Sequence, residues 1–299
     1  MATSYFKKKR FRENRDGILF LLPALITFSV FLAIPLLMTF GLIFMDFNLI
    51  GPSQFVGFRN FYRLSIDPLF GRVIGNTIRF LLILMPIHCV LSLALAYAVY
   101  HVRYRKFRSL YRGIIFFPIA VPTASVAIAW VFMFATDTGF INFFIRQLGG
   151  SNVPWMTNPV MMYVTIALFS AWKFIGTSFL LYYIGLRNIP SSYHEAAMID
   201  GANKFQTFLR ITLPLLTPTI FFVIVTNIIY IFQIFEEPFF ITGSNPHVMS
   251  MALLIYQNAF ISMRFGYASL LAVILLLIMI LITITLIWNQ KRWVNYDYE

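Results

Sequence analysis

The stretch Glu195-Ala196-Ala197-Met198-Ile199-Asp200-Gly201, followed by Ile211-Thr212-Leu213-Pro214, stands between two long apolar segments of this 299-residue chain. The segments cover residues 161–186 and 215–235. A plain loop of a few residues would be enough to join them. The insert instead carries signals that start and stop helices, so we expect it to be a folded element.

The composition places most of the chain in lipid. Its residues are 60% hydrophobic and only 11% charged, and 34 of them are phenylalanine. A water-soluble domain cannot bury that much apolar surface. The net charge of +12 does not indicate a nucleic-acid partner, because Lys and Arg of membrane proteins gather in cytoplasmic loops beside anionic lipid headgroups. We therefore expect a protein that contacts membrane lipid and binds no nucleic acid.

Six stretches are apolar enough to cross the hydrocarbon core, which takes about 20 helical residues. This pattern predicts an all-α polytopic membrane protein with six transmembrane helices. The first stretch is too long for the h-region of a signal peptide, and no small-residue cleavage site ends it. The predicted spans are residues 18–44, 80–99, 113–134, 161–186, 215–235 and 268–288.

The Lys and Arg residues indicate the orientation, because they concentrate on the cytoplasmic side of membrane proteins. With both termini on one side, that side receives six in the N-terminal tail, five after the second span, three after the fourth and two in the C-terminal tail. The opposite side receives six, and the last, Lys173, lies inside a span. We therefore predict a cytoplasmic N-terminal tail (1–17), a transmembrane domain (18–290) with a cytoplasmic loop (188–214), and a cytoplasmic C-terminal tail (291–299).

Three segments on the opposite side are too apolar for plain loops and too short to span the membrane. These segments, residues 55–64, 139–148 and 252–263, are expected to form short interfacial helices that either brace the bundle or dock a partner. Prolines inside the spans, including Pro118 and Pro122, remove backbone hydrogen bonds and bend helices. The bundle should therefore be bent as well as packed.

The cytoplasmic insert is predicted to be a short helix, a turn and a second short helix. Ser192 with Glu195 three residues later matches a capping box, and Gly201 can end the first helix in the left-handed conformation. Asn203 with Gln206 predicts the start of the second helix. Small side chains at positions 196 and 197 would leave one side of the first helix thin enough to enter a groove of another protein.

The spacing in this insert resembles the signature loop of permease subunits in bacterial and archaeal ABC importers. That pattern is Glu-Ala-Ala, three residues, Gly, nine residues, Ile, one residue and Leu-Pro. Within the family, the chain resembles carbohydrate permeases of the maltose and glycerol-phosphate type in Ile199-Asp200-Gly201-Ala202, in Phe55-Val56-Gly57-Phe58-Arg59-Asn60-Phe61 and in Asn76-Thr77. Every position of the loop pattern is matched, by Glu195, Ala196, Ala197, Gly201, Ile211, Leu213 and Pro214.

The resemblance implies a type I ABC importer permease in a prokaryotic cell membrane. It implies that the first loop helix sits in a cleft of a cytoplasmic ATPase dimer, and that a second permease subunit and an extracytoplasmic binding protein complete the importer. The sequence contains no Gly-x-x-x-x-Gly-Lys-Ser/Thr phosphate loop, so ATP and Mg²⁺ are expected on the partner ATPase. We expect no catalytic residue, metal site or cofactor in this chain. The expected coupling residues are Glu195, Ala196, Ala197, Asp200, Gly201, Ile211, Leu213 and Pro214.

Candidates for a substrate path come from polar and aromatic positions of the third to fifth spans. Ionisable groups inside spans usually face a cavity or pair with one another. Lys173 is such a group, and it shares a helix face with Ser170 and Thr177. A sugar needs hydrogen-bonding groups and aromatic faces. The alternative is that these residues only hold helices in register. The candidates are Lys173, Thr177, Asn227, Tyr230, Gln233, Trp172 and Trp130.

Other functions remain open from the sequence alone. The same mechanism could carry glycerol phosphate, an acidic sugar or a polyamine, with Lys173 reading an anionic group. An ion-coupled secondary transporter would need carboxylates at mid-membrane and inverted repeats, which the spans do not show. A membrane-embedded enzyme would need a cluster of His, Cys or carboxylate residues. His88 is instead expected to be a packed, hydrogen-bonded histidine, because no carboxylate shares its span.

Overall fold

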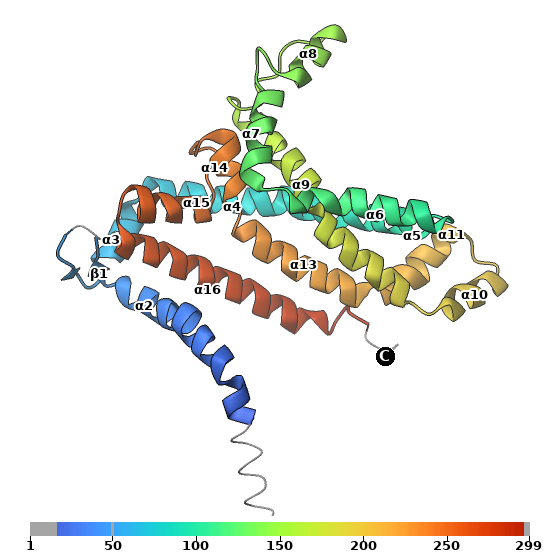
Figure 1. Cartoon of the computed structure of the whole chain (residues 1–299), viewed down its shortest axis with the longest axis horizontal. Helices are drawn as coiled ribbons and strands as arrows, with labels where there is room; N and C mark the ends of the chain where they lie inside the picture. The colour runs from blue at the N-terminus through green and yellow to red at the C-terminus, as the bar shows by residue number, and fades with distance from the viewer. Residues whose placement is uncertain (1–16, 49–50, 296–299) are drawn as a thin grey trace, which may run out of the picture. The chain divides into compact units, whose positions relative to one another are not determined.

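The computed structural model describes residues 17–48 and 51–295. The predicted N-terminal tail (1–17), apart from Gly17, lies outside this range, and so do residues 296–299 of the predicted C-terminal tail. The chain divides into two compact units: residues 1–65 with 258–273, and residues 66–257 with 274–299. Figure 1 shows the chain coloured from its N-terminus to its C-terminus.

The all-helical, polytopic architecture expected from the sequence is confirmed. Within the described residues, four helices are long and apolar enough to cross a membrane, and the number rises to six if each of two bent helix pairs is one span. The four are Gly17–Leu42, Pro68–Tyr100, Pro159–Asn188 and Phe265–Gln290. The bent pairs are Arg105–Ala120 with Thr123–Met133, and Lys204–Leu215 with Thr217–Phe232.

The first unit contains the first long helix and the short elements after it. The helix includes a π-helical turn, and two residues on each side of the next loop form a small antiparallel ladder that an all-α prediction does not include. The elements are η1 (Ser29–Ala33), α2 (Ile34–Leu42), β1 (Met45–Asp46), β2 (Gln54–Phe55) and α3 (Arg59–Ile66).

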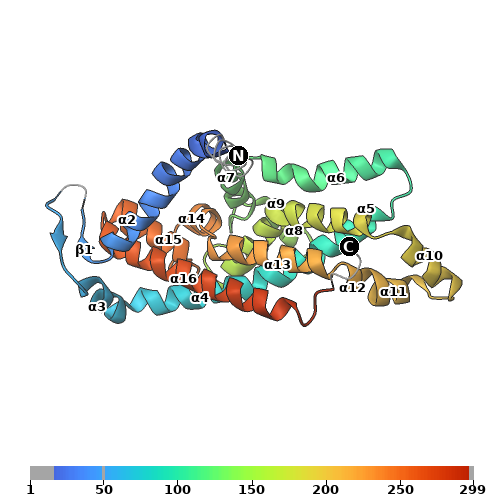
Figure 2. The same ribbon diagram turned by 90° about the horizontal axis from the view of Figure 1, so that it is seen from below.

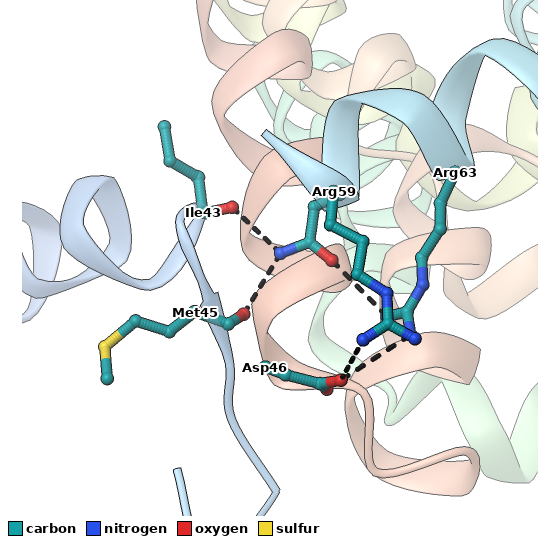
Figure 3. A network of polar contacts seen from close by, with 6 residues as sticks. Ile43, Met45, Asp46, Arg59 and Arg63 are labelled. Atoms are coloured by element: carbon teal, nitrogen blue, oxygen red, sulfur yellow. Dashed lines mark hydrogen bonds and ion pairs between the residues drawn. The ribbon is translucent and has the colours of Figure 1, made fainter. Parts of the chain in front are cut away.

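Asn60 holds the turn between α2 and β1 together. Its side chain is fully buried, and its Nδ2 donates to the carbonyls of Ile43 (2.8 Å) and Met45 (3.0 Å). Figure 3 shows the guanidinium groups of Arg59 and Arg63 pointing toward the carboxylate of Asp46, at 3.9 and 3.5 Å. The segment that resembles carbohydrate permeases on this side therefore has a structural role in closing the turn.

The second unit is built around the long helix α9. This helix contacts α4, η2, α5, α6, α13 and α14, and Figure 2 shows α6 and α13 on opposite sides of it. The elements from α4 onward are α4 (Pro68–Pro86), η2 (Ile87–Leu91), α5 (Ser92–Tyr100), α6 (Arg105–Ala120), α7 (Thr123–Met133), α8 (Phe140–Gln147), α9 (Pro159–Asn188), α10 (Ser191–Ile199), α11 (Lys204–Thr207), η3 (Phe208–Thr212), α12 (Leu213–Leu215), α13 (Thr217–Phe232), α14 (Glu236–Thr242), α15 (Met251–Tyr256), η4 (Gln257–Ile261) and α16 (Phe265–Gln290), the last two continuing into the first unit.

The third predicted span is not one continuous helix. Residues 113–134 were expected to cross as a unit, but α6 and α7 meet at an angle of 95°. The break falls at Val121-Pro122, where Val121 is extended (ψ 138°) because a following proline disfavours the helical conformation. The fifth predicted span, residues 215–235, starts at a bend of 66° between Leu215 and Thr217, and its single helix α13 ends at Phe232 rather than at residue 235.

The three segments expected as short helices are helical. Residues 139–148 contain α8, residues 252–263 contain most of α15 and η4, and residues 55–64 contain most of α3. The side chains of Asn76 and Thr77 join α4 to the segment that precedes α15 and to the first residue of α15. Asn76 Nδ2 donates to the carbonyls of Pro246 (3.0 Å) and Met249 (3.1 Å), and Thr77 Oγ1 accepts from the Met251 N–H (3.1 Å).

Candidate functional site

Helix α10 of the cytoplasmic insert begins one residue before the predicted capping box. Pro190 occupies the N-cap position, and no side chain caps the helix. The predicted Ser192–Glu195 box is therefore wrong, because Ser192 already lies in the first helical turn and its hydroxyl is not at the N-cap. Pro190 provides a fixed φ of −59° and an extended ψ of 137°, which suffices to start the helix after α9.

The predicted end of α10 at Gly201 is confirmed. Gly201 has a φ of +75°, in the left-handed region where a residue without Cβ is favoured. The Ala202 N–H donates to the Ala197 carbonyl (2.9 Å), and the Gly201 N–H donates to the Met198 carbonyl (3.1 Å). These two bonds form a Schellman motif, which fixes the direction in which the chain leaves the helix.

The second predicted helix of the insert is also confirmed. Asn203 and Gln206 form the expected capping box, with both hydrogen bonds at 2.9 Å. The helix α11 continues through η3 and α12 to the bend before α13. A ring nitrogen of His194 in α10 contacts the buried Thr212 hydroxyl in η3 (3.3 Å), so the first loop helix is joined to the segment that leads into α13.

The exposed surface of α10 carries two large apolar side chains beside its polar ones. Met198 is 75% exposed and Ile199 is 87% exposed, on a helix whose both ends are held by backbone geometry. Glu195, Ala196 and Asp200 are exposed as well, whereas Ala197 packs inward and is buried. Figure 1 shows α10 and α11 together at one end of the second unit. Only one of the two alanines therefore lies on the accessible side of the helix.

Lys173 does not share an environment with its predicted neighbours on α9. Its side chain is 2% exposed, and its Nζ donates to the carbonyls of Pro118 (2.6 Å), Ile119 (3.3 Å) and Val121. These carbonyls belong to the end of α6 and the break after it, where the following turn does not supply a full set of N–H donors; the Pro118 carbonyl also accepts from the Val121 N–H (3.3 Å). Thr177 is exposed. A role for Lys173 and Thr177 in the substrate path remains a prediction.

Gly176 lies one turn beyond Lys173 and brings α6 close to α9. A Cβ at this position would lie 2.7 Å from the carbonyl oxygen of Ile115 and 3.1 Å from the Cα of Phe116. Both atoms belong to the backbone of α6, so a side chain could be accommodated only if the helices moved apart. Lys173 and Gly176 together hold the broken span against α9.

Asn227 and Tyr230 of α13 belong to a buried polar network that the sequence did not reveal. Asn227 Oδ1 lies 2.8 Å from His88 Nδ1, and His88 Nε2 lies 3.2 Å from Ser170 Oγ. Ser170 Oγ lies 3.2 Å from the Tyr230 hydroxyl, which also contacts the buried carboxyl group of Glu237. The prediction of a packed, hydrogen-bonded His88 is confirmed. The link to Glu237 was missed because these residues come from four separate elements.

The remaining candidates lie in two different places. Trp130 and Trp172 are neighbours, with ring centroids 5.8 Å apart, and Trp172 is 41% exposed. The Tyr230 ring packs instead on Phe174 (4.7 Å). Gln233 is exposed, directly after the end of α13. The structure therefore offers one accessible aromatic surface at the two tryptophans and one polar position at the end of α13.

Comparisons with known proteins agree with this architecture. The family model described as "Binding-protein-dependent transport system inner membrane component" matches residues 90–294. The chain is 34% identical to the probable ABC transporter permease protein YesP of Bacillus subtilis (strain 168), over 96% of this chain and 94% of that one. It is 32% identical to the trehalose/maltose transport system permease protein MalF of Thermococcus litoralis, over 82% and 83% of the two chains.

A solved structure shows the same fold. The crystal structure of a bacterial ABC transporter involved in the import of the acidic polysaccharide alginate matches with a TM-score of 0.81 at 24% sequence identity, covering 96% of this chain and 100% of that one. The family model covers more than half of the chain and the signature loop lies within it. The chain therefore belongs to the binding-protein-dependent transport system inner membrane components, as a multi-pass ABC importer permease subunit without a catalytic domain.

Proposed function

We propose that this permease imports a sugar or an oligosaccharide and forms the translocation path with a second permease subunit. The relative from Thermococcus litoralis is named for trehalose and maltose transport and matches most of both chains. The segments at residues 55–61, 76–77 and 199–202, which resemble carbohydrate permeases, also support this substrate class. Because the chain belongs to an ABC importer family, ATP hydrolysis rather than an ion gradient drives this import.

The energy for transport enters through the insert at residues 195–201. The main support for this proposal is that α10 exposes Met198 and Ile199 to solvent although the backbone geometry at both ends of the helix is well defined. Exposed apolar side chains on a rigid cytoplasmic helix are typical of a docking surface. Their occupant is a cytoplasmic ATPase dimer, which binds the ATP and Mg²⁺, while a binding protein delivers the sugar on the opposite side.

Movement of α10 reaches the membrane helices through two connections. The chain passes through the Schellman turn at Gly201 into α11, η3 and α12, which carry Ile211, Leu213 and Pro214. The contact between His194 and Thr212 joins α10 directly to η3. A displacement of α10 by the ATPase therefore pulls on the segment that leads into α13.

The candidate residues that are accessible in this conformation are the first that a substrate could contact. Trp172 with Trp130 offers an aromatic surface for the C–H face of a sugar ring, and Gln233 and Thr177 offer hydrogen-bonding groups. Lys173, Asn227 and Tyr230 have protein partners in this conformation, so they would contact substrate only if the helices rearranged.

The coupling role is tested by substitutions on α10 in the reconstituted importer with its ATPase and binding protein. We expect Glu195→Lys and Ile199→Asp each to reduce uptake by about tenfold or more. A tenfold reduction corresponds to the loss of about 1.4 kcal/mol of binding free energy from one interface contact. Both residues are exposed, so thermal stability should not change. Ser192→Ala is the matched control, because Ser192 is exposed and caps nothing. Normal uptake and normal stimulated ATP hydrolysis in both α10 variants would exclude this docking surface.

The substrate class is tested separately, on the cognate binding protein. Thermal stabilisation of that protein across a panel of neutral sugars, acidic sugars, glycerol phosphate and polyamines should single out a neutral sugar or oligosaccharide. Stabilisation by glycerol phosphate or a polyamine alone would replace carbohydrate as the cargo and leave the coupling mechanism intact.

A further inference from the structure

The buried network that joins α14, α13, α9 and η2 forms an unbranched chain of polar contacts. It runs from the Glu237 carboxyl group to the Tyr230 hydroxyl, the Ser170 hydroxyl, the two nitrogens of His88 and the Asn227 carbonyl oxygen. Four of the five residues are buried, and Tyr230 is partly buried. The chain contains four links, and each link requires one hydrogen atom.

The amide of Asn227 fixes the direction of the last link. Its Nδ2 donates to the backbone carbonyl of Val223 (2.8 Å) and to Ser178 Oγ (2.9 Å). A carbonyl can only accept, so the nitrogen must face Val223 and the oxygen must face His88. Because Asn227 Oδ1 offers no hydrogen, His88 Nδ1 has to carry one.

Counting hydrogens then shows a deficit. With Glu237 as a carboxylate and His88 neutral, the network has one hydrogen on Tyr230, one on Ser170 and one on His88 Nδ1. Three hydrogens cannot fill four links, and one link would consist of two facing lone pairs in a buried site. Such a contact carries a desolvation penalty with no bond in return.

We propose that this network is a proton-binding site that holds one proton more than its carboxylate and neutral-imidazole form. With the proton on Glu237, the carboxylic acid donates to Tyr230, Tyr230 to Ser170, Ser170 to His88 Nε2, and His88 Nδ1 to Asn227. With the proton on His88, the imidazolium donates in both directions and Tyr230 donates to a Glu237 carboxylate. Both arrangements fill all four links, and the proton comes from and returns to solvent water.

The charges around the network are compatible with proton binding at Glu237. Burial is the largest influence on this carboxyl group and raises its pKa to about 7, and the neighbouring Glu236 carboxylate raises it further. The Tyr230 hydrogen bond and the Lys173 ammonium oppose this effect. Among the described residues, the Lys173 Nζ itself is bonded to backbone carbonyls rather than to Glu237.

Loss of the proton would loosen one end of the second unit. Glu237 attaches α14 to α13 through Tyr230, and Ser170 attaches both to α9. In the unprotonated network one of the three links between Glu237 and His88 has no hydrogen. Proton occupancy therefore controls how firmly α14, α13, α9 and η2 are held to one another, independently of which solute the permease carries.

The test compares the pH dependence of thermal stability in the purified complete importer. A carboxyl group whose folded pKa is raised stabilises the folded state below its unfolded pKa of about 4.5, and this contribution is lost as pH rises to about 7. The wild-type melting temperature should therefore fall by several degrees between pH 5 and pH 8, on the order of a hundredfold in the folding equilibrium. In Glu237→Gln the carboxamide supplies the fourth hydrogen permanently, so this fall should disappear.

Glu236→Gln is the matched control, because it removes an adjacent carboxylate that is exposed. We expect it to keep the fall of the melting temperature with pH, with its midpoint moved to slightly lower pH because one neighbouring carboxylate is gone. An identical pH profile in wild type and Glu237→Gln would overturn the proposal. If Glu237→Gln does not fold, infrared spectroscopy of the wild type decides. A carboxylic acid carbonyl band that persists near pH 6 in wild type and in Glu236→Gln, or a doubly protonated histidine in ¹⁵N spectra, supports the site, and the absence of both signals overturns it.

Discussion

Substitution of Lys173 by methionine tests whether this residue holds the broken third span. The methionine side chain fills a similar volume but donates no hydrogen bond. In the wild type, Nζ receives no carboxylate partner within ion-pair distance among the described residues and instead donates to the carbonyls of Pro118, Ile119 and Val121. The ammonium also lies at the C-terminal end of α6, where a helix dipole favours a positive charge.

The size of the effect follows from the groups left behind. Each buried carbonyl that loses its only donor costs about 1–3 kcal/mol. Removal of the buried ammonium returns part of its desolvation penalty, which amounts to several kcal/mol for an ion. The Pro118 carbonyl keeps the Val121 N–H as a donor (3.3 Å), so the carbonyls of Ile119 and Val121 carry most of the cost, and we expect Lys173→Met to destabilise the protein by about 2–4 kcal/mol. Lys173→Arg keeps the positive charge and should lose much less.

The assay combines thermal unfolding of the purified importer with uptake of neutral and acidic sugars. For Lys173→Met we expect a lower melting temperature and an equal loss of uptake for both sugar classes. Lys204→Met is the control, since Lys204 is exposed at the start of α11. An unchanged melting temperature with a loss confined to acidic sugars would refute the structural role and identify Lys173 as an anion-reading residue in the path.

Three further predictions concern packing and the substrate path. Gly176→Ala should lower the melting temperature because the new Cβ meets the α6 backbone, whereas Gly71→Ala in α4, where a Cβ meets nothing within 4 Å, should not; equal values would contradict the close approach. Asn60→Ala should destabilise by about 2–3 kcal/mol in thermal unfolding, since two carbonyls lose a donor; an unchanged value would show that the turn is held by other contacts. Trp172→Ala should reduce sugar uptake more than stability, whereas Trp130→Ala, in a half-buried ring, should reduce both; intact uptake in Trp172→Ala would remove it from the path.

The helical architecture was predictable because hydropathy and local capping rules act within a few residues. The Asn203–Gln206 capping box and the glycine terminus at Gly201 follow from side chains that contact their own neighbours in sequence. The predicted Ser192–Glu195 capping box is wrong for a reason that is also local in sequence. A preceding Pro190 already sets the backbone conformation at the N-cap, so the helix begins before Ser192 can cap it.

The candidate path was less predictable because its contacts join distant elements. Helical spacing places Lys173 and Ser170 on the same face of the helix. Lys173 nevertheless bonds to carbonyls at the break after α6, whereas Ser170 contacts His88. The pairing depends on where α6 ends and how α9 packs, which no local pattern encodes. Glu237 lies beyond the end of α13 at Phe232, in the first turn of α14, so no helical spacing relates it to Tyr230.

One helix connects the two parts of the mechanism. The insert at residues 195–201 leads through η3 and α12 into α13, and α13 carries both Asn227 and Tyr230 of the buried network. A shift of α13 by about 1 Å in the direction of these contacts would lengthen hydrogen bonds of 2.8 and 3.2 Å beyond their normal range. Coupling by the insert and proton occupancy of the network would therefore act on the same element. Asn227→Leu removes one end of the network. We expect this substitution to change the number of ATP molecules hydrolysed per sugar imported, although Asn227 lies far from α10 in sequence.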